Sequence, residues 1–170
     1  DATTYRLYAN LEDPTDKFSA WFGNNLATLE INAPEGVFNS TFNASWNASG
    51  INPAFLPVFP ELADDTYATI GLEGPAASSE IAAAADPAVV QDENQEITPF
   101  FIDDGSTSLL SNTVTGAAVY VLNTAGNALP DADQRVLIMQ ITTTGTISGQ
   151  VNYQVFPLGV GANDVSYLIP

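Results

Sequence analysis

The sequence predicts an all-β protein built as an antiparallel β-sandwich. Short runs rich in Val, Ile, Thr, Tyr and Phe alternate apolar with polar positions, which is the two-residue period of a strand. Gly, Pro, Asn and Asp separate these runs and supply the turns. Because helical patterns are few, we expect about eight to ten strands with one or two short helical turns, in an immunoglobulin-like or jelly-roll-like sandwich.

The N-terminal half begins with three predicted strands. Residues 3–11 alternate apolar and polar side chains, as a half-buried strand does. Residues 18–22 and 28–32 flank a Gly-Asn-Asn sequence at 23–25, whose tolerance for left-handed backbone predicts a hairpin between the two strands. Two further candidate strands follow at residues 66–72 and 97–102.

The strongest strand pattern lies in the C-terminal half, where three long strands are predicted at residues 114–122, 135–143 and 146–156. Residues 123–133 form a longer loop between the first two, and the Thr-Gly pair at 144–145 is expected to close a hairpin between the last two. Strand 135–143 carries apolar side chains on both faces near its start. It is therefore predicted to lie centrally in its sheet, covered on both sides.

Two short segments carry helical signals. The Asn-Pro pair at residues 52–53 is a good helix start, but later prolines end that helix within about two turns. The alanine-rich residues 78–85 favour a helix until an Asp-Pro pair stops it. We expect neither to be a core helix. Since no fixed-period repeat or low-complexity linker divides the chain, residues 1–170 are predicted to form a single β-sandwich domain.

Charge excludes two classes of partner. The chain has 20 acidic residues against three basic ones, Arg6, Lys17 and Arg135, and a net charge of −17. Nucleic acids and anionic membrane surfaces are bound through clusters of Lys and Arg, so neither partner is expected. No apolar stretch approaches the ~20 residues that span a bilayer, so membrane insertion is not expected either.

Histidine and cysteine are absent, which removes the side chains that most catalytic sites use. Without them the chain cannot build a Ser-His-Asp triad, a Cys-His pair or a zinc site of His and Cys ligands. Carboxylate chemistry remains, but a glycoside hydrolase needs two acids across a cleft, one with a raised pKa. No spacing singles out such a pair. We therefore predict no enzymatic activity, with a carboxylate-based glycoside hydrolase as the alternative.

The acidic loops are the candidate metal sites. Calcium takes about six to eight oxygen ligands and prefers flexible loops with carboxylates and main-chain carbonyls. Two loops place a pair of carboxylates close together, and the predicted calcium ligands are Asp103, Asp104, Asp131 and Asp133. No loop has the twelve-residue spacing of an EF-hand. The alternative is that these acids are solvated charges with ordinary turn roles.

Three glycosylation sequons follow one another, with acceptor residues Asn39, Asn43 and Asn47. In a eukaryotic secreted protein they would form a surface cluster of glycans, whereas in most bacteria they would mark only a polar, turn-prone stretch. Aromatic side chains recur with the same spacing, at Phe38, Phe42 and Trp46. An irregular segment anchored to the body of the protein by its aromatics fits this pattern as well.

Two stretches, residues 51–72 and residues 126–140 with 147–154, resemble uncharacterised exported β-rich proteins of marine and other environmental bacteria. The resemblance implies secretion and a β-sandwich-like domain, and it brings no catalytic residues. The chain begins at Asp1 rather than Met, which also predicts an exported precursor that has lost a signal peptide. An acidic, lysine-poor surface suits a saline exterior, where salt screens its self-repulsion.

These observations favour an extracellular self-assembling structural protein, a subunit of a cell-surface filament, tube or sheath that binds copies of itself. Catalytic residue types are missing, and Thr/Val/Ile-rich strands offer edges for pairing between subunits. Repulsion between subunits would be offset by salt, by calcium bridging, or by interfaces that bury apolar area while leaving acids outside, and calcium bridging is the first of these to test. The alternative is a secreted carbohydrate- or calcium-binding module whose partner is an extracellular polysaccharide. Trp21, Trp46 and Tyr153 could form a sugar-stacking platform, although Trp in a small β-domain is usually a core residue.

Overall fold

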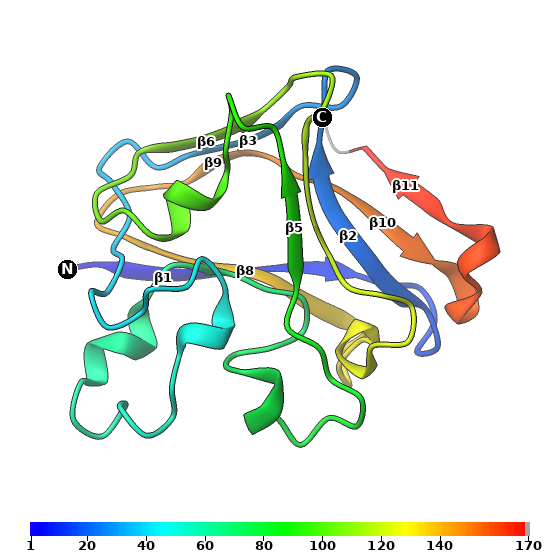
Figure 1. Ribbon diagram of the computed structural model, residues 1–170, viewed down its shortest axis with the longest axis horizontal. Helices are drawn as coiled ribbons and strands as arrows, with labels where there is room; N and C mark the ends of the chain where they lie inside the picture. The colour runs from blue at the N-terminus through cyan, green and yellow to red at the C-terminus, as the bar shows by residue number, and fades with distance from the viewer. Residues whose placement is uncertain (169–170) are drawn as a thin grey trace.

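The computed structural model of the protein describes residues 1–168 as an all-β fold (Figure 1). Its strands are β1 (Thr3–Asn10), β2 (Lys17–Gly23), β3 (Leu29–Asn32), β4 (Tyr67–Ala68), β5 (Ala88–Gln91), β6 (Ser108–Ser111), β7 (Ala117–Tyr120), β8 (Arg135–Thr143), β9 (Ser148–Gln150), β10 (Asn152–Phe156) and β11 (Val165–Tyr167). Every pairing between these strands is antiparallel, as predicted. Within the described residues there is no α-helix, and the helical turns are seven short 3-10 helices rather than one or two.

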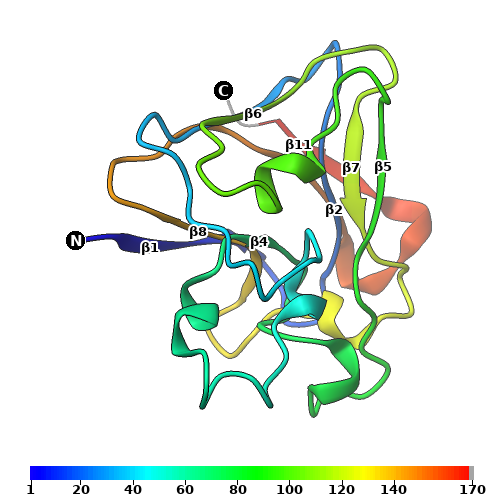
Figure 2. The ribbon, with the colours of Figure 1, turned by 60° about the vertical axis from the view of Figure 1, so that its left-hand side comes forward.

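The strands form three sheets that pack as a sandwich. Their strand orders are β1-β8-β4, β11-β10-β2-β7-β5 and β6-β3-β9. In Figure 1, β1 and β8 cross the middle of the view, the sheet of β3, β6 and β9 lies above them, and β2, β10 and β11 lie to the right. Figure 2 shows β5 and β7 beside β2 on the same side of the molecule. The second and third sheets therefore fold around one side of the first.

Strand β8 is central in its sheet, as its sequence predicted. It pairs with β1 along most of its length and with β4 over two residues. All of its side chains except Arg135 are buried, so both faces are covered. One face contributes to the main core, and the other lies against the segment between β3 and β4.

Hydrogen bonds hold that segment against β8. The amide of Phe38 donates to the carbonyl oxygen of Thr142 (2.7 Å). The side-chain amide of Gln140 donates to the carbonyl oxygens of Ala63 (2.9 Å) and Asp65 (2.8 Å). A second, smaller hydrophobic cluster fills the segment itself; its buried members are Ala48, Ile51, Leu62, Tyr67 and Leu72.

The hairpin predicted at residues 23–25 is wrong, because β2 and β3 do not pair with each other. Strand β2 pairs antiparallel with β10 and strand β3 pairs antiparallel with β9. Only Val151 separates β9 from β10, so these two strands continue in one direction. Their antiparallel partners β3 and β2 therefore also run in the same direction as each other. Residues 24–28 loop out between them, and the Asn24 side chain closes this loop by accepting hydrogen bonds from the amides of Leu26 (2.8 Å) and Ala27 (2.9 Å).

Residues 112–116 loop out in the same way between β6 and β7, which pair with β3 and β2. We call residues 24–28 and 112–116 the corner loops. They are in contact, because a Cβ added to Gly116 would overlap the carbonyl oxygen of Gly23 and meet the Asn24 side chain at 3.0 Å. The hairpin predicted at residues 144–145 is also wrong, since β9 pairs with β3 and not with β8.

The prediction of a strand at residues 97–102 is wrong. Residues Thr98–Phe101 form a 3-10 helix, with Pro99 in its first turn and the rings of Phe100 and Phe101 buried in the core. A proline at this position favours a helical start and removes a donor that a ladder would need. The strand predicted at 66–72 is reduced to the two residues of β4, and the helical signals at 52–53 and 78–85 give only turns and a 3-10 helix at Ala76–Ser78.

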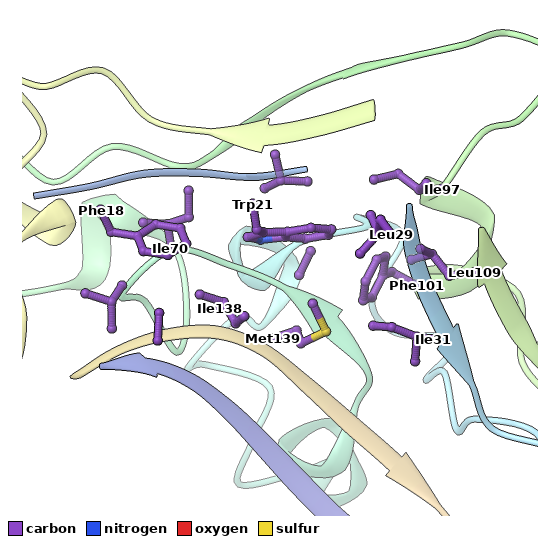
Figure 3. Packing of buried hydrophobic residues seen from close by; sticks show 14 of the residues in the cluster. Phe18, Trp21, Leu29, Ile31, Ile70, Ile97, Phe101, Leu109, Ile138 and Met139 are labelled. Atoms are coloured by element: carbon purple, nitrogen blue, oxygen red, sulfur yellow. The ribbon is translucent and has the colours of Figure 1, made fainter. Parts of the chain in front are cut away.

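The main hydrophobic core fills the space between the sheets (Figure 3). Trp21 of β2 is fully buried, and its ring packs edge-on against Phe101 with the ring centroids 6.2 Å apart. Met139 of β8 approaches from the opposite layer. Trp21 therefore joins elements that are far apart in the sequence, and it is a core residue rather than a sugar-stacking one.

Candidate functional site

The loop that carries Asp131 and Asp133 is neutralised in part by Arg135. The Arg135 guanidinium pairs with Asp131 at 3.1 Å and with Asp133 at 2.9 Å, and it also lies 4.5 Å from the centre of the Tyr8 ring. Desolvation alone would raise the pKa of Asp131, but hydrogen bonds from Arg135 outweigh it and hold that pKa below its usual value. A calcium ion here would compete with an existing cation.

The loop of Asp103 and Asp104 has a different environment. The Asp104 carboxylate accepts a hydrogen bond from the amide of Asn39 (3.0 Å), and the carbonyl oxygen of Asp103 accepts one from the Asn39 side chain (3.0 Å). Both acidic side chains are exposed. Within residues 1–168 no three acidic side chains converge closely enough to hold a metal ion. Calcium binding at either loop stays a prediction and would need other oxygens to complete its ligands.

The three sequon asparagines, Asn39, Asn43 and Asn47, are buried, with 4–5% of their surface exposed. Their side-chain nitrogens, to which a glycan would be joined, donate hydrogen bonds inside the protein. The acceptors are the carbonyl oxygens of Phe100 and Asp103, the carboxylate of Asp65 and the carbonyl oxygen of Pro87. This arrangement favours the alternative in which the stretch anchors an irregular segment.

Asp65 is a buried carboxylate that sequence reasoning did not single out. Its two oxygens accept hydrogen bonds from the amide of Ser40 and the side chain of Asn43, each at 2.6 Å. Desolvation raises its pKa to about 6, against the opposing effect of these hydrogen bonds. Because Asp65 is 1% exposed and ties the sequon segment to the β4 side of the molecule, its role here is structural.

Four exposed carboxylates surround a groove of about 490 Å³ beside the start of β1. They come from three separate turns and are Glu35, Glu61, Asp64 and Asp104. Threonines of β1 and β8 line its floor, and its lining includes no Lys or Arg. This acidic groove brings together one predicted calcium ligand, Asp104, with three acids that sequence reasoning did not group. A negative groove of this kind attracts cations.

A second groove, of about 350 Å³, opens between β1 and β9. We call it the core groove, because buried residues Ile31 and Ile138 of the main core line it. Its lining carries no charged side chain, and Tyr8 and Tyr153 add aromatic surface. Strand β1 ends one sheet and β9 ends another, so each has an unpaired edge. The core groove marks the place where the sandwich is open.

The strands of the five-stranded sheet carry one charged residue, Lys17 at the start of β2, and the nearest carboxylate on this sheet is that of Asp164, which accepts a hydrogen bond from the Gln154 side chain. The strands β2, β5, β7, β10 and β11 contain no acidic residue. A shallow hollow of about 340 Å³ runs over the outer face of this sheet, with Ala20, Ala118 and the half-exposed Val90 in its lining. The opposite sheet has its outer face covered by the segment that holds Asp65, so the molecule has one covered side and one bare side.

Comparison of the chain with protein-family models, with curated proteins and with solved structures finds no match in any of the three. Across the described residues no helix is both long and apolar enough to cross a membrane. The surfaces themselves therefore carry the functional argument. The acidic groove and the core groove are each formed by segments that are distant in the sequence, so no local sequence pattern predicts either of them.

Proposed function

We propose that this protein is an extracellular structural subunit that assembles with copies of itself into a filament, tube or sheath at the cell surface. One observation carries the proposal. In a molecule with a net charge of −17, several apolar surfaces are exposed on elements without any carboxylate, above all the bare face of the five-stranded sheet.

Electrostatics explains why this separation matters. Two copies of a strongly acidic protein repel each other, and the repulsion falls steeply with distance and with salt. Electrostatic repulsion between two copies is weakest at contacts that bring no acidic side chain of one copy against an acidic side chain of the other. An exposed apolar face whose strands carry no acidic residue is typical of an interaction surface. The open edges of β1 and β9 add main-chain groups that can pair with another chain.

Polymers are the expected result when the purified protein is imaged by electron microscopy in high salt or with calcium. Lowering the salt should dissolve them. The distance over which like charges repel each other is about 10 Å at 0.1 M salt and becomes longer as the ionic strength falls. Light scattering across a salt series measures the change. A protein that stays monomeric at every salt and calcium concentration would exclude the proposal.

Calcium is the proposed bridge between subunits, through the acidic groove and the predicted ligands Asp103, Asp104, Asp131 and Asp133. Adding a chelator in moderate salt should then depolymerise the assembly, and magnesium at the same concentration should not replace calcium. Persistence of polymers in chelator would exclude calcium as the bridge while leaving assembly itself in place.

A secreted carbohydrate-binding module is the second candidate, and the core groove favours it. Tyr8 and Tyr153 line an uncharged groove large enough for a small ligand. The Tyr153 ring stacks with Phe18 and Tyr167, so Tyr8 supplies the aromatic surface that suits a sugar ring. Such a module would be a monomer that binds a neutral extracellular polysaccharide. Titration calorimetry with neutral oligosaccharides would separate this candidate from the first.

A further inference from the structure

The two most exposed large apolar side chains of the described residues lie one on each of the two corner loops. Leu26 is 87% exposed and Val114 is 83% exposed. Figures 1 and 2 show the loops that carry them side by side at the top of the molecule. Neither corner loop contains a charged residue. The corner therefore presents two exposed aliphatic side chains, which we call the knob, on uncharged loops whose nearest carboxylate is that of Asp92.

Hydrogen bonds hold the knob in shape. Within the first loop the Asn24 carboxamide closes the turn, as described above. In the second, the Thr113 hydroxyl donates to the carboxylate of Asp92 (2.6 Å) and accepts from the amide of Gly116 (3.0 Å). A loop whose backbone is already held in shape loses little conformational freedom when it binds.

The core groove has the complementary chemistry. Its walls include Leu7, Ile147 and Val151, its floor is the main core, and its lining is uncharged. An apolar cavity of about 150 Å³ holds a benzene molecule. The groove, at about 350 Å³, therefore has room for two aliphatic side chains.

We propose that the corner loops of one copy place Leu26 and Val114 in the core groove of the next copy. The knob and the core groove belong to different parts of the surface, so this contact is heterologous. Each copy inserts its knob into one neighbour and holds the knob of another neighbour in its core groove. Repetition of a heterologous contact produces a ring if the rotation closes and an open filament if it does not. The inference rests on the proposed function and names the contact by which the subunits assemble.

Single cysteines test the contact directly, because the natural chain has none. Leu26→Cys places a thiol on the knob, and Ser148→Cys places one in the lining of the core groove. An equimolar mixture of the two variants, oxidised under polymerising conditions, should give mainly the mixed disulfide dimer. Leu122→Cys, which is also highly exposed but lies on neither surface, is the matched control in place of Leu26→Cys.

A mixed disulfide at least about tenfold more abundant with Leu26→Cys than with Leu122→Cys supports the knob-in-groove contact. Dimers of Leu26→Cys with itself as the main product would show a symmetric contact and overturn it. Equal linkage of the two variants to Ser148→Cys would overturn it as well.

A second measurement uses no cross-link. The double variant Leu26→Ser with Val114→Ser should raise the concentration needed for polymerisation about tenfold or more, since two buried aliphatic anchors are lost. Leu122→Ser should leave it unchanged. If the wild type polymerises and the double variant polymerises equally well, this inference fails and the proposed function stands. If the wild type never polymerises, both fail.

Discussion

Replacing Trp21 with alanine is expected to lower the free energy of unfolding by about 3–5 kcal/mol, the range found when a large buried aromatic side chain is removed. Trp21 is fully buried between the sheets (Figure 3), and its indole N–H donates to the carbonyl oxygen of Thr69 (3.3 Å). Alanine would leave a cavity against Phe101 and remove the donor from a buried carbonyl group. Urea unfolding followed by circular dichroism measures the loss, independently of tryptophan fluorescence.

Two variants separate the causes of that loss. Trp21→Phe keeps aromatic volume but cannot donate, so it should cost about 1–3 kcal/mol through the unsatisfied Thr69 carbonyl and a smaller cavity. Trp46→Ala removes the other tryptophan, which is only partly buried, and should cost less than Trp21→Ala. A loss below about 1 kcal/mol for Trp21→Ala would contradict the central place of this side chain in the core.

Elements with a strong local pattern were predictable from the sequence. Strands β1 and β8 lie where alternation and two-sided apolar composition place them, and β8 is central as expected. These elements are long, so many residues report the same period. The strands β5, β6 and β11 were missed. Each has only three or four residues, and the adjacent Val-Val and Leu-Leu pairs of β5 and β6 break the alternation that marks the equally short β3.

The failures concern how strands pair. A Gly-Asn-Asn sequence forms a tight loop whether the chain reverses or continues, and only the pairing partners decide between the two. At residues 24–28 the chain continues in the same direction, because β2 pairs with β10 and β3 pairs with β9, and β9 and β10 run in one direction. The Gly-Asn-Asn sequence does form a loop there, but which strands pair on either side of it depends on partners more than 100 residues away in the sequence.

The candidate site shows the same limit. The predicted calcium ligands do lie in loops, but sequence gave no means of seeing that Arg135 pairs with Asp131 and Asp133 or that Asp104 faces a groove with three other acids. The burial of Asn39, Asn43 and Asn47 was equally hidden, because a sequon is recognised by its letters and burial depends on Asp65 and other distant partners.

Asp65→Ala is expected to lower the free energy of unfolding by about 2–4 kcal/mol. The substitution leaves two buried donors, the Ser40 amide and the Asn43 side chain, without their acceptors, and each unsatisfied buried group costs about 1–3 kcal/mol. Asp64→Ala is the matched control: the neighbouring acid is exposed, and its replacement should change stability by less than about 0.5 kcal/mol. Urea unfolding at about pH 4, where Asp65 holds its proton in the folded state, measures both.

The effect of Asp65 also depends on pH, and its sign is opposite to that of a salt-bridged aspartate. Burial raises its pKa in the folded protein to about 6 from an ordinary value of 3.8, so the folded state binds a proton more tightly than the unfolded state does. Between these two values the unfolded state holds fewer protons, and stability falls as pH rises. The contribution of the protonated group is complete below about pH 4 and is lost as pH rises through about 6.

The difference in unfolding free energy between the wild type and Asp65→Ala should therefore be larger at about pH 4 than at about pH 7. The shift of roughly two pKa units sets the change at about 3 kcal/mol, at 1.36 kcal/mol per unit. Repulsion among the other carboxylates varies with pH too, but it is common to both proteins and cancels in the difference. A difference that grows between pH 4 and 7 would mean that the hydrogen bonds from Ser40 and Asn43, rather than desolvation, control this carboxyl group.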